Sequence, residues 1–343
     1  MSIEQIVQRM SLVQSIGDPD SVVAAWFARH VSAPGCAALA NEVNDRVAAL
    51  VPAVVPGGDM RTVTAAVKFC CHWLFGPLEA RPARLGAADC RRAGWAAAEE
   101  VAAATIAYGD AHPEVAVRAR CAALLATFER YYREEGGEGG LPPGWPAGWT
   151  ADELDTLVRP PRPDQPDLLG LYDATDDPRE RATLALLASA VDDATAADIA
   201  RLAELAAACW PHGDERVAVN PVFGDRARRG APEADWVSGG TLYLCRTTWE
   251  PRPLGRQHVL QLLGYILLDW QDRYRIRGGG WYFTRQQLRV EYPLDDLIAR
   301  LCPTGDLPTL RASWRQTLLD DGGRTTAFRP VQARLFASRR GRW

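Results

Sequence analysis

The residues best suited to chemistry lie around one expected hairpin and on the helix that follows it. Asp235 precedes a Ser-Gly-Gly turn at 238–240, and Arg246 lies on the β-rich run after the turn. Gln261 and Tyr265 are four residues apart, so both would lie on one face of a helix. A carboxylate can bind a hard cation such as Mg²⁺, and an arginine can bind phosphate but cannot act as a general base. These residue types therefore suit the binding of a cation, a phosphate or both.

The hairpin and the helix carry three stretches in a recognisable order: EADW at 233–236, GTLYLCRTT at 240–248 and QLLGY at 261–265. Together they resemble the RecB-like branch of the PD-(D/E)XK nucleases. In that family an aspartate ends one strand, a (D/E)-x-K-T element lies on the next strand, and a Q-x-x-x-Y element lies on the following helix. The resemblance is confined to the C-terminal half of the chain. It implies residues that hold Mg²⁺, activate a water and hydrolyse a phosphodiester.

Two chemical positions differ from the family pattern. Asp235 corresponds to the first metal ligand, but Leu244 stands where the family has its second carboxylate and Arg246 where it has its lysine. Leucine cannot bind Mg²⁺, and arginine stays protonated. We do not expect Lys68 to substitute, since it lies far back in a separate helical region. The resemblance thus implies a nuclease fold with lost or damaged cutting chemistry, whose candidate catalytic residues are Asp235, Arg246, Gln261 and Tyr265.

Three glutamates are alternatives for the missing carboxylate. Glu233 would share a strand face with Asp235, although a solvated charge is the simpler reading. Glu204 lies on the helix before the expected sheet, where an exposed glutamate is equally consistent. Glu250 lies just past the strand. The candidate metal ligands are Asp235, Glu204 and Glu233, and the cofactor is either none or Mg²⁺.

Positive charge is carried almost wholly by arginine, and arginines crowd the last part of the chain among aromatic residues. Such a mixture suits phosphate contacts combined with base stacking. A solvated arginine surface explains the same residues, and this alternative stays open. The candidate contacts to nucleic acid are Arg246, Arg273, Arg275 and Arg285.

The elements that would position these residues divide the chain into three parts. Residues 1–134 repeat apolar residues at helical spacing, which predicts a bundle of four or five helices acting as a scaffold or partner surface. Residues 135–166 are rich in glycine and proline, which predicts a linker or long surface loop. Residues 167–343 are expected to form an α/β domain with a basic C-terminal tail. The fold class is therefore α+β overall: an N-terminal all-α bundle, then an α/β core that the resemblance makes restriction-endonuclease-like.

The elements expected within the last part follow from local patterns. Asp192 is a candidate helix cap, and Gly-Gly between two β-rich runs indicates a hairpin. The expected helices are 178–190, 194–209, 255–270 and 294–301, and the expected strands are 217–220, 234–237, 241–247, 281–284 and 288–292.

The bulk composition is that of an ordinary soluble globular protein, with 47% hydrophobic and 24% charged residues. A formal charge of -4 argues against coating nucleic acid along the whole surface, but it leaves a local basic groove open. The eight cysteines share no repeated spacing, which predicts buried, reduced thiols in a cytoplasmic protein rather than a zinc site. Without a signal segment or an apolar run of about 18 residues, we expect no membrane contact.

Three functions follow as hypotheses. The first is a degenerate, inactive PD-(D/E)XK nuclease-like protein that binds DNA, RNA or a protein partner. Because such folds are found in defence systems and mobile elements, the resemblance implies a role of that kind. The second is an active Mg²⁺-dependent nuclease with migrated carboxylates. The third is a structural protein–protein interaction module. A cleavage assay separates the first two, and a mobility shift at low salt separates the first from the third.

Overall fold

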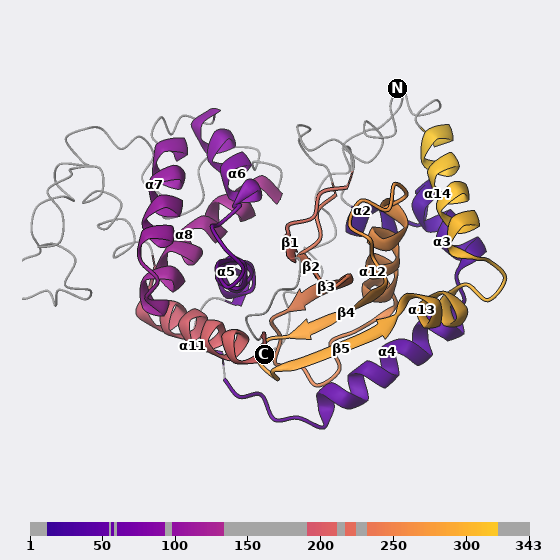
Figure 1. The fold of residues 1–343 in the computed structure, drawn as a ribbon, viewed down its shortest axis with the longest axis horizontal. Coiled ribbons are helices and arrows are strands. Elements are labelled where there is room, and N and C mark those ends of the chain that lie inside the picture. Colours follow the sequence, from indigo (N-terminus) through magenta and orange to yellow (C-terminus); the bar gives the residue numbers. More distant parts are fainter. Residues whose placement is uncertain are drawn as a thin grey trace, which may run out of the picture.

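A five-stranded mixed sheet lies between two groups of helices (Figure 1). The computed structural model describes residues 12–54, 56–57, 60–92, 98–133, 191–210, 217–223 and 232–321. The expected α+β fold class is confirmed at this level. Within the described residues, no helix is both long enough and apolar enough to cross a bilayer.

The sheet contains its strands in chain order, β1 to β5. The β3–β4 pair is parallel and the other three pairs are antiparallel. Gly239 and Gly240, with φ of 56° and 82°, form the predicted hairpin turn, a conformation that costs glycine little. The strands are β1 (Val217–Val219), β2 (Trp236–Ser238), β3 (Thr241–Arg246), β4 (Gly278–Phe283) and β5 (Leu288–Pro293).

The helices fall into an N-terminal series and a C-terminal series. The N-terminal series is α2 (Leu12–Gly17), α3 (Val22–His30), α4 (Ala33–Ala48), α5 (Met60–Trp73), α6 (Arg81–Arg92), α7 (Ala98–Ala111) and α8 (Val115–Arg133). The C-terminal series is α11 (Asp193–Cys209), α12 (Arg256–Leu268), α13 (Leu294–Leu301) and α14 (Leu307–Asp321). The Asp192 side chain accepts the Thr195 N–H, which confirms the predicted cap. The predicted helix 178–190 and the predicted linker 135–166 lie outside the described residues.

The sequence predicts four or five N-terminal helices, whereas the described part of that region contains seven. Ser21 and Ser32 each cap a new helix, accepting the N–H groups of Ala24 and Gly35, so the chain restarts twice within a short stretch. Apolar periodicity alone does not reveal such restarts, because buried residues recur on both sides of each cap.

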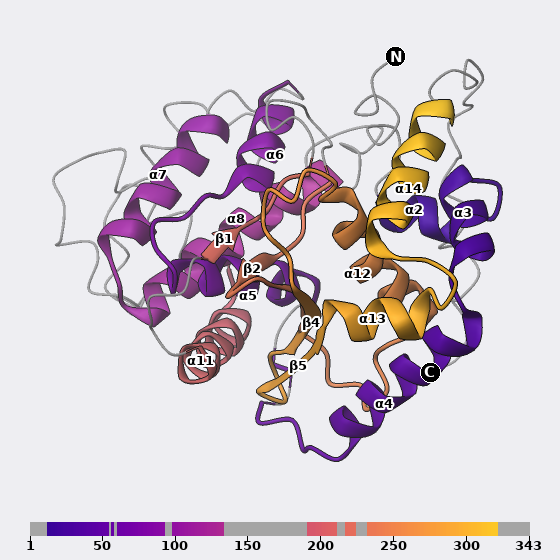
Figure 2. The same cartoon turned by 45° about the vertical axis from the view of Figure 1, so that its right-hand side comes forward.

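The sheet separates two hydrophobic cores, because neighbouring residues on a strand point to opposite faces. Tyr243 and Cys245 of β3 point into a core with α5 to α8 and α11, here called the α5-side core. Leu242 and Leu244 point into a core with α2 to α4 and α12 to α14, here called the α12-side core. Both views show these two groups of helices on opposite sides (Figures 1 and 2). The described helices of residues 1–134 therefore do not form one bundle.

Helix α4 is joined to the α12 side by a specific polar clamp. The buried Asn44 side chain donates to the Leu254 carbonyl and accepts the Leu254 N–H, both at 2.9 Å. A buried amide needs such partners. The clamp fixes the loop between β3 and α12 against the N-terminal helices.

Strand β4 starts earlier than its pattern predicts, at Gly278 instead of Trp281. Glycines usually weaken a strand. Here the neighbouring strand and helices lie so close to β4 that side chains at these positions would have no room. A Cβ on Gly280 would lie 2.0 Å from the Val290 carbonyl oxygen, and one on Gly279 would lie 3.0 to 3.3 Å from three leucine and isoleucine side chains of α12 and α13. The glycines therefore belong to the packed sheet.

The expected basic tail begins as a packed helix. Leu310, Trp314 and Leu318 of α14 recur every four residues and are buried in the α12-side core. The Arg311 side chain donates to the Ile266 carbonyl at 3.2 and 3.3 Å. Residues 322–343, which include six further arginines, lie outside the described residues.

Candidate functional site

Asp235 lies immediately before β2, and both of its carboxylate oxygens are engaged. The Lys68 ammonium of α5 lies 2.8 Å from Oδ1, and the Cys245 backbone N–H donates to Oδ2 at 2.6 Å. The prediction that Lys68 is too remote to matter is therefore wrong. Helix α5 packs Val63 and Val67 into the α5-side core, and this packing carries Lys68 to the edge of the hairpin.

The Asp235 carboxylate is strongly held in its charged form. Burial would raise its pKa, but the Lys68 ammonium, the Cys245 N–H and the Arg246 guanidinium together lower the pKa below its ordinary value. The pair is only partly buried, since the side chains of Lys68 and Asp235 are 26% and 14% exposed. Solvent, or a ligand, can therefore reach it.

Arg246 ends β3 and bonds to the next helix. Its Nη2 donates to Oε1 of Gln261 at 2.7 Å, which gives this amide a partner on an otherwise largely apolar helix. Burial lowers the pKa of Arg246, and Asp235 opposes that shift. Among the described residues, Arg246 Nε has no hydrogen-bond partner. We call Lys68, Asp235, Arg246 and Gln261 the polar cluster.

Tyr265 and His258 flank the polar cluster on α12. The Tyr265 ring is buried and stacks on Phe223, with centroids 5.7 Å apart. Tyr265 also interacts electrostatically with Arg246. Burial, with Arg246 adding to it, lowers the pKa of His258 to about 4, so this ring is neutral near pH 7. Sequence reasoning did not single out His258.

The alternative carboxylates do not join Asp235. Glu233 forms an ion pair with Arg81 of α6, and its side chain is 4% exposed, so it is not a solvated charge. Glu204 lies on the exposed face of α11, paired with Arg201 at 2.9 Å. Glu250 is exposed beyond β3.

The donor set of the polar cluster does not fit Mg²⁺. The cluster offers one carboxylate, already neutralised by a lysine, and Leu244 is 2% exposed in the α12-side core where the family pattern has its second acid. Across the described ranges, no three histidine, cysteine, aspartate or glutamate residues lie close enough to hold a metal ion. Mg²⁺ favours several hard oxygen ligands, and this cluster offers a single carboxylate.

One of the four predicted nucleic-acid contacts is wrong. Arg285, in the turn between β4 and β5, is 0% exposed and donates two hydrogen bonds to Asp198 of α11, at 2.8 and 2.7 Å. A guanidinium enclosed in this way cannot reach a phosphate. The sequence showed an arginine in a polar turn, and only the packing of α11 explains its burial.

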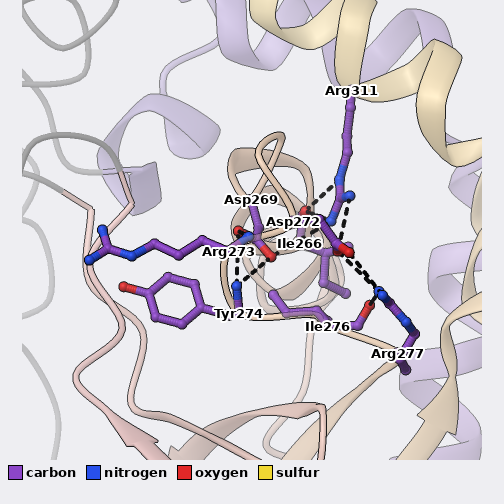
Figure 3. A network of polar contacts seen from close by, with 8 residues as sticks. All are labelled: Ile266, Asp269, Asp272, Arg273, Tyr274, Ile276, Arg277 and Arg311. Atoms are coloured by element: carbon purple, nitrogen blue, oxygen red, sulfur yellow. Dashed lines mark hydrogen bonds and ion pairs between the residues drawn. The ribbon is translucent and has the colours of Figure 1, made fainter.

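Arg273 and Arg275 are exposed on the loop after α12. Figure 3 shows the Asp269 carboxylate accepting the backbone N–H groups of Arg273 and Tyr274, while the Arg273 side chain extends away over the Tyr274 ring at 5.5 Å. Within the part of the chain that the structure describes, neither arginine pairs with a carboxylate. Both remain available to an anionic partner.

Lys68 is the residue that sequence reasoning missed most directly. It is the only lysine in a chain whose other basic residues are arginines. That exception was the available signal, because a composition so biased against lysine makes a single one informative.

No family model, curated protein or solved structure matches this chain.

Proposed function

We propose that this protein is a nuclease-related protein that holds nucleic-acid phosphate at the polar cluster without cutting it. The order helix, three strands, helix, strand from α11 to β4 supports a core of the PD-(D/E)XK kind. So does the grouping of Asp235, Arg246 and Gln261 in one cluster, since these are the positions that the resemblance singled out.

The Lys68–Asp235 ion pair carries the proposal. An ammonium 2.8 Å from the carboxylate occupies the place that a bound cation would take beside Asp235. A metal at Asp235 would compete with this ammonium at Oδ1 and with the Cys245 N–H at Oδ2, and it would find no second acid in the cluster. The pair thus neutralises the carboxylate without supplying a Lewis acid.

The charge of the cluster favours an anionic ligand. Lys68 and Arg246 are two cations against the single carboxylate of Asp235. Excess positive charge in a partly buried site attracts phosphate, and arginine binds phosphate oxygens in charge-assisted hydrogen bonds. Exposed Arg273 and Arg275 offer further phosphate contacts outside the cluster. A nucleic acid, with many phosphates in a row, fits both groups of cations.

Binding and cleavage assays on the full chain test the proposal. Labelled single-stranded and duplex DNA and RNA should bind, with an affinity that falls as salt rises. Arg246→Gln should weaken binding about ten-fold, because a charged phosphate contact is lost, whereas Arg201→Gln on α11 is the matched control and should not. No product should form with Mg²⁺ or Mn²⁺. Equal affinity of the Arg246→Gln variant and the parent would contradict the proposal.

The single lysine allows a test without mutation. An amine-reactive reagent modifies Lys68 as the only lysine side chain, and mass spectrometry measures the rate. A bound oligonucleotide should slow this modification several-fold if phosphate lies beside the ammonium. An unchanged rate of Lys68 modification at saturating oligonucleotide would show that phosphate does not bind beside this ammonium.

A second candidate is an active nuclease, and Lys68 itself favours it. The lysine that the motif lacks on β3 is supplied beside Asp235 from α5, which restores a lysine–carboxylate pair. Metal-dependent cleavage that Asp235→Ala abolishes would establish this second function and exclude the first. If no nucleic acid binds at any salt concentration, a protein–protein module remains.

A further inference from the structure

Trp249 is an exposed aromatic residue next to the polar cluster. It follows the end of β3, three residues after Arg246, and is 61% exposed. Of the described large apolar residues that are exposed, it is the one aromatic ring. Single exposed apolar residues are common, so exposure alone carries no argument. Its position three residues after Arg246 and the ordered loop that carries it are the features that point to a ligand.

The loop that carries Trp249 is held on both sides. On one side, Gln286 donates to the Thr248 carbonyl and the Glu250 N–H donates to the Thr248 hydroxyl, both at 3.1 Å. On the other side, Asn44 clamps Leu254, and Arg252 pairs with Asp45 at 2.8 Å. The indole is therefore presented to solvent by an ordered loop.

The spacing brings the indole and the cations within reach of one ligand. Three residues span at most about 11 Å, even when fully extended. Arg246 lies at one end of this span, and the exposed carboxylate of Glu250 lies next to Trp249 at the other. A phosphate near Trp249 is thus attracted by the charge of Arg246 and repelled by that of Glu250.

We propose that Trp249 stacks against a base of a single strand whose phosphate lies at the polar cluster. This inference rests on the proposed function and narrows its ligand to unpaired nucleic acid. Every base offers a face for stacking, so the contact tolerates sequence. In a duplex the faces are already stacked on neighbouring pairs, so Trp249 contributes nothing to duplex binding. Trp249 thereby selects single strands over duplexes.

Anisotropy with a labelled oligo-dT and a labelled duplex of equal length tests this selection. Trp249→Ala should weaken single-strand binding roughly five-fold to a hundred-fold, the range for one base stacked on an aromatic ring. Trp249→Phe should keep most of the affinity, and duplex binding should be unchanged in both. Leu319→Ala, another exposed apolar truncation, is the matched control.

The outcomes distinguish this inference from the proposed function. If Arg246→Gln weakens binding while Trp249→Ala does not, or if Trp249→Ala weakens duplex binding equally, stacking is overturned and the phosphate site stands. If Arg246→Gln has no effect while Trp249→Ala does, an aromatic contact exists and the phosphate site is wrong. Both ideas fall if the parent protein binds neither ligand.

Discussion

Two of the ion pairs between the α5-side helices and the sheet or its flanking segments differ in almost every physical respect. Arg285–Asp198 is enclosed, with exposed fractions of 0% and 2%, two parallel hydrogen bonds and a further bond from Arg285 to the Val54 carbonyl. Lys68–Asp235 has a single close contact and is reachable by solvent. A guanidinium fork makes a fixed two-point contact, whereas an ammonium is a rotatable point charge.

The comparison separates an enclosed ion pair from one that solvent reaches. Arg285 uses both of its terminal nitrogens within the protein and joins α11, the β4–β5 turn and the segment before α5, where Ala53 N–H also donates to the Arg285 carbonyl. The side chains of Lys68 and Asp235 are 26% and 14% exposed, so solvent reaches this pair. Burial therefore decides which cation can take part in recognition.

The largest expected effect is on the enclosed pair. Arg285→Met should lower the free energy of unfolding by about 3–5 kcal/mol, because it leaves Asp198 buried without its partner. Urea unfolding measures the loss. The double variant Arg285→Met, Asp198→Leu should recover most of it, since no buried charge remains. A loss below about 1 kcal/mol in the single variant would show that the pair is not enclosed as described.

The second expected effect is a pH dependence that arises beside the accessible pair. His72 lies one turn after Lys68 and is 2% exposed. Burial lowers its pKa from 6.5 to about 4, with Asp235 opposing and Lys68 adding to the shift. The unfolded chain then binds this proton first, so stability is full above pH 6.5 and falls towards pH 4, by about 3 kcal/mol in total.

Urea unfolding between pH 7 and pH 4 measures this dependence, and His72→Gln should flatten it. His258 contributes in the same direction, so the variant should reduce the slope and not remove it. An identical slope in the parent and the variant would mean that His72 titrates normally.

The third expected effect is smaller and sharpens the contrast between the two pairs. Lys68→Met should cost about 1–2 kcal/mol, less than Arg285→Met, because Asp235 keeps the Cys245 N–H, the field of Arg246 and some solvent. The same variant should weaken oligonucleotide binding. A stability loss equal to that of Arg285→Met would make Lys68–Asp235 a structural pair as well.

The smallest expected effect sets the baseline. Arg201→Ala removes an ion pair on α11 whose side chains are 56% and 52% exposed. Surface pairs of this kind contribute at most about 0.5 kcal/mol within a helix. Urea unfolding of this variant should match the parent closely. A loss above 1 kcal/mol would put the difference between exposed and enclosed pairs in question.

Most secondary structure could be predicted because local rules govern it. The Asp192 cap, the Gly-Gly hairpin and the helix beginning near Gly255 follow from preferences that act over a few residues. Strand β4 was predicted to begin at residue 281 and begins at Gly278, because glycines do not favour a strand by themselves. Its place in the sheet depends on how closely α12, α13 and β5 approach, and no local pattern records that distance.

Only those site residues that lie on consecutive elements of the chain could be predicted together. Asp235, Arg246 and Gln261 lie on consecutive elements, so strand and helix geometry brings them together. Lys68 and Arg285 depended on contacts between α5, α11 and the sheet, which are far apart in the chain. One arginine predicted to be exposed is buried, and one lysine predicted to be remote is in contact.

The sequence by itself determined the elements and the chemical types gathered around the hairpin, because hydrogen bonding and apolar spacing act over a few residues. Only the tertiary structure decided which charges are paired, which are buried and which remain open to a ligand. The physical reason is that the cost of burying a charge depends on the partner that packing brings to it.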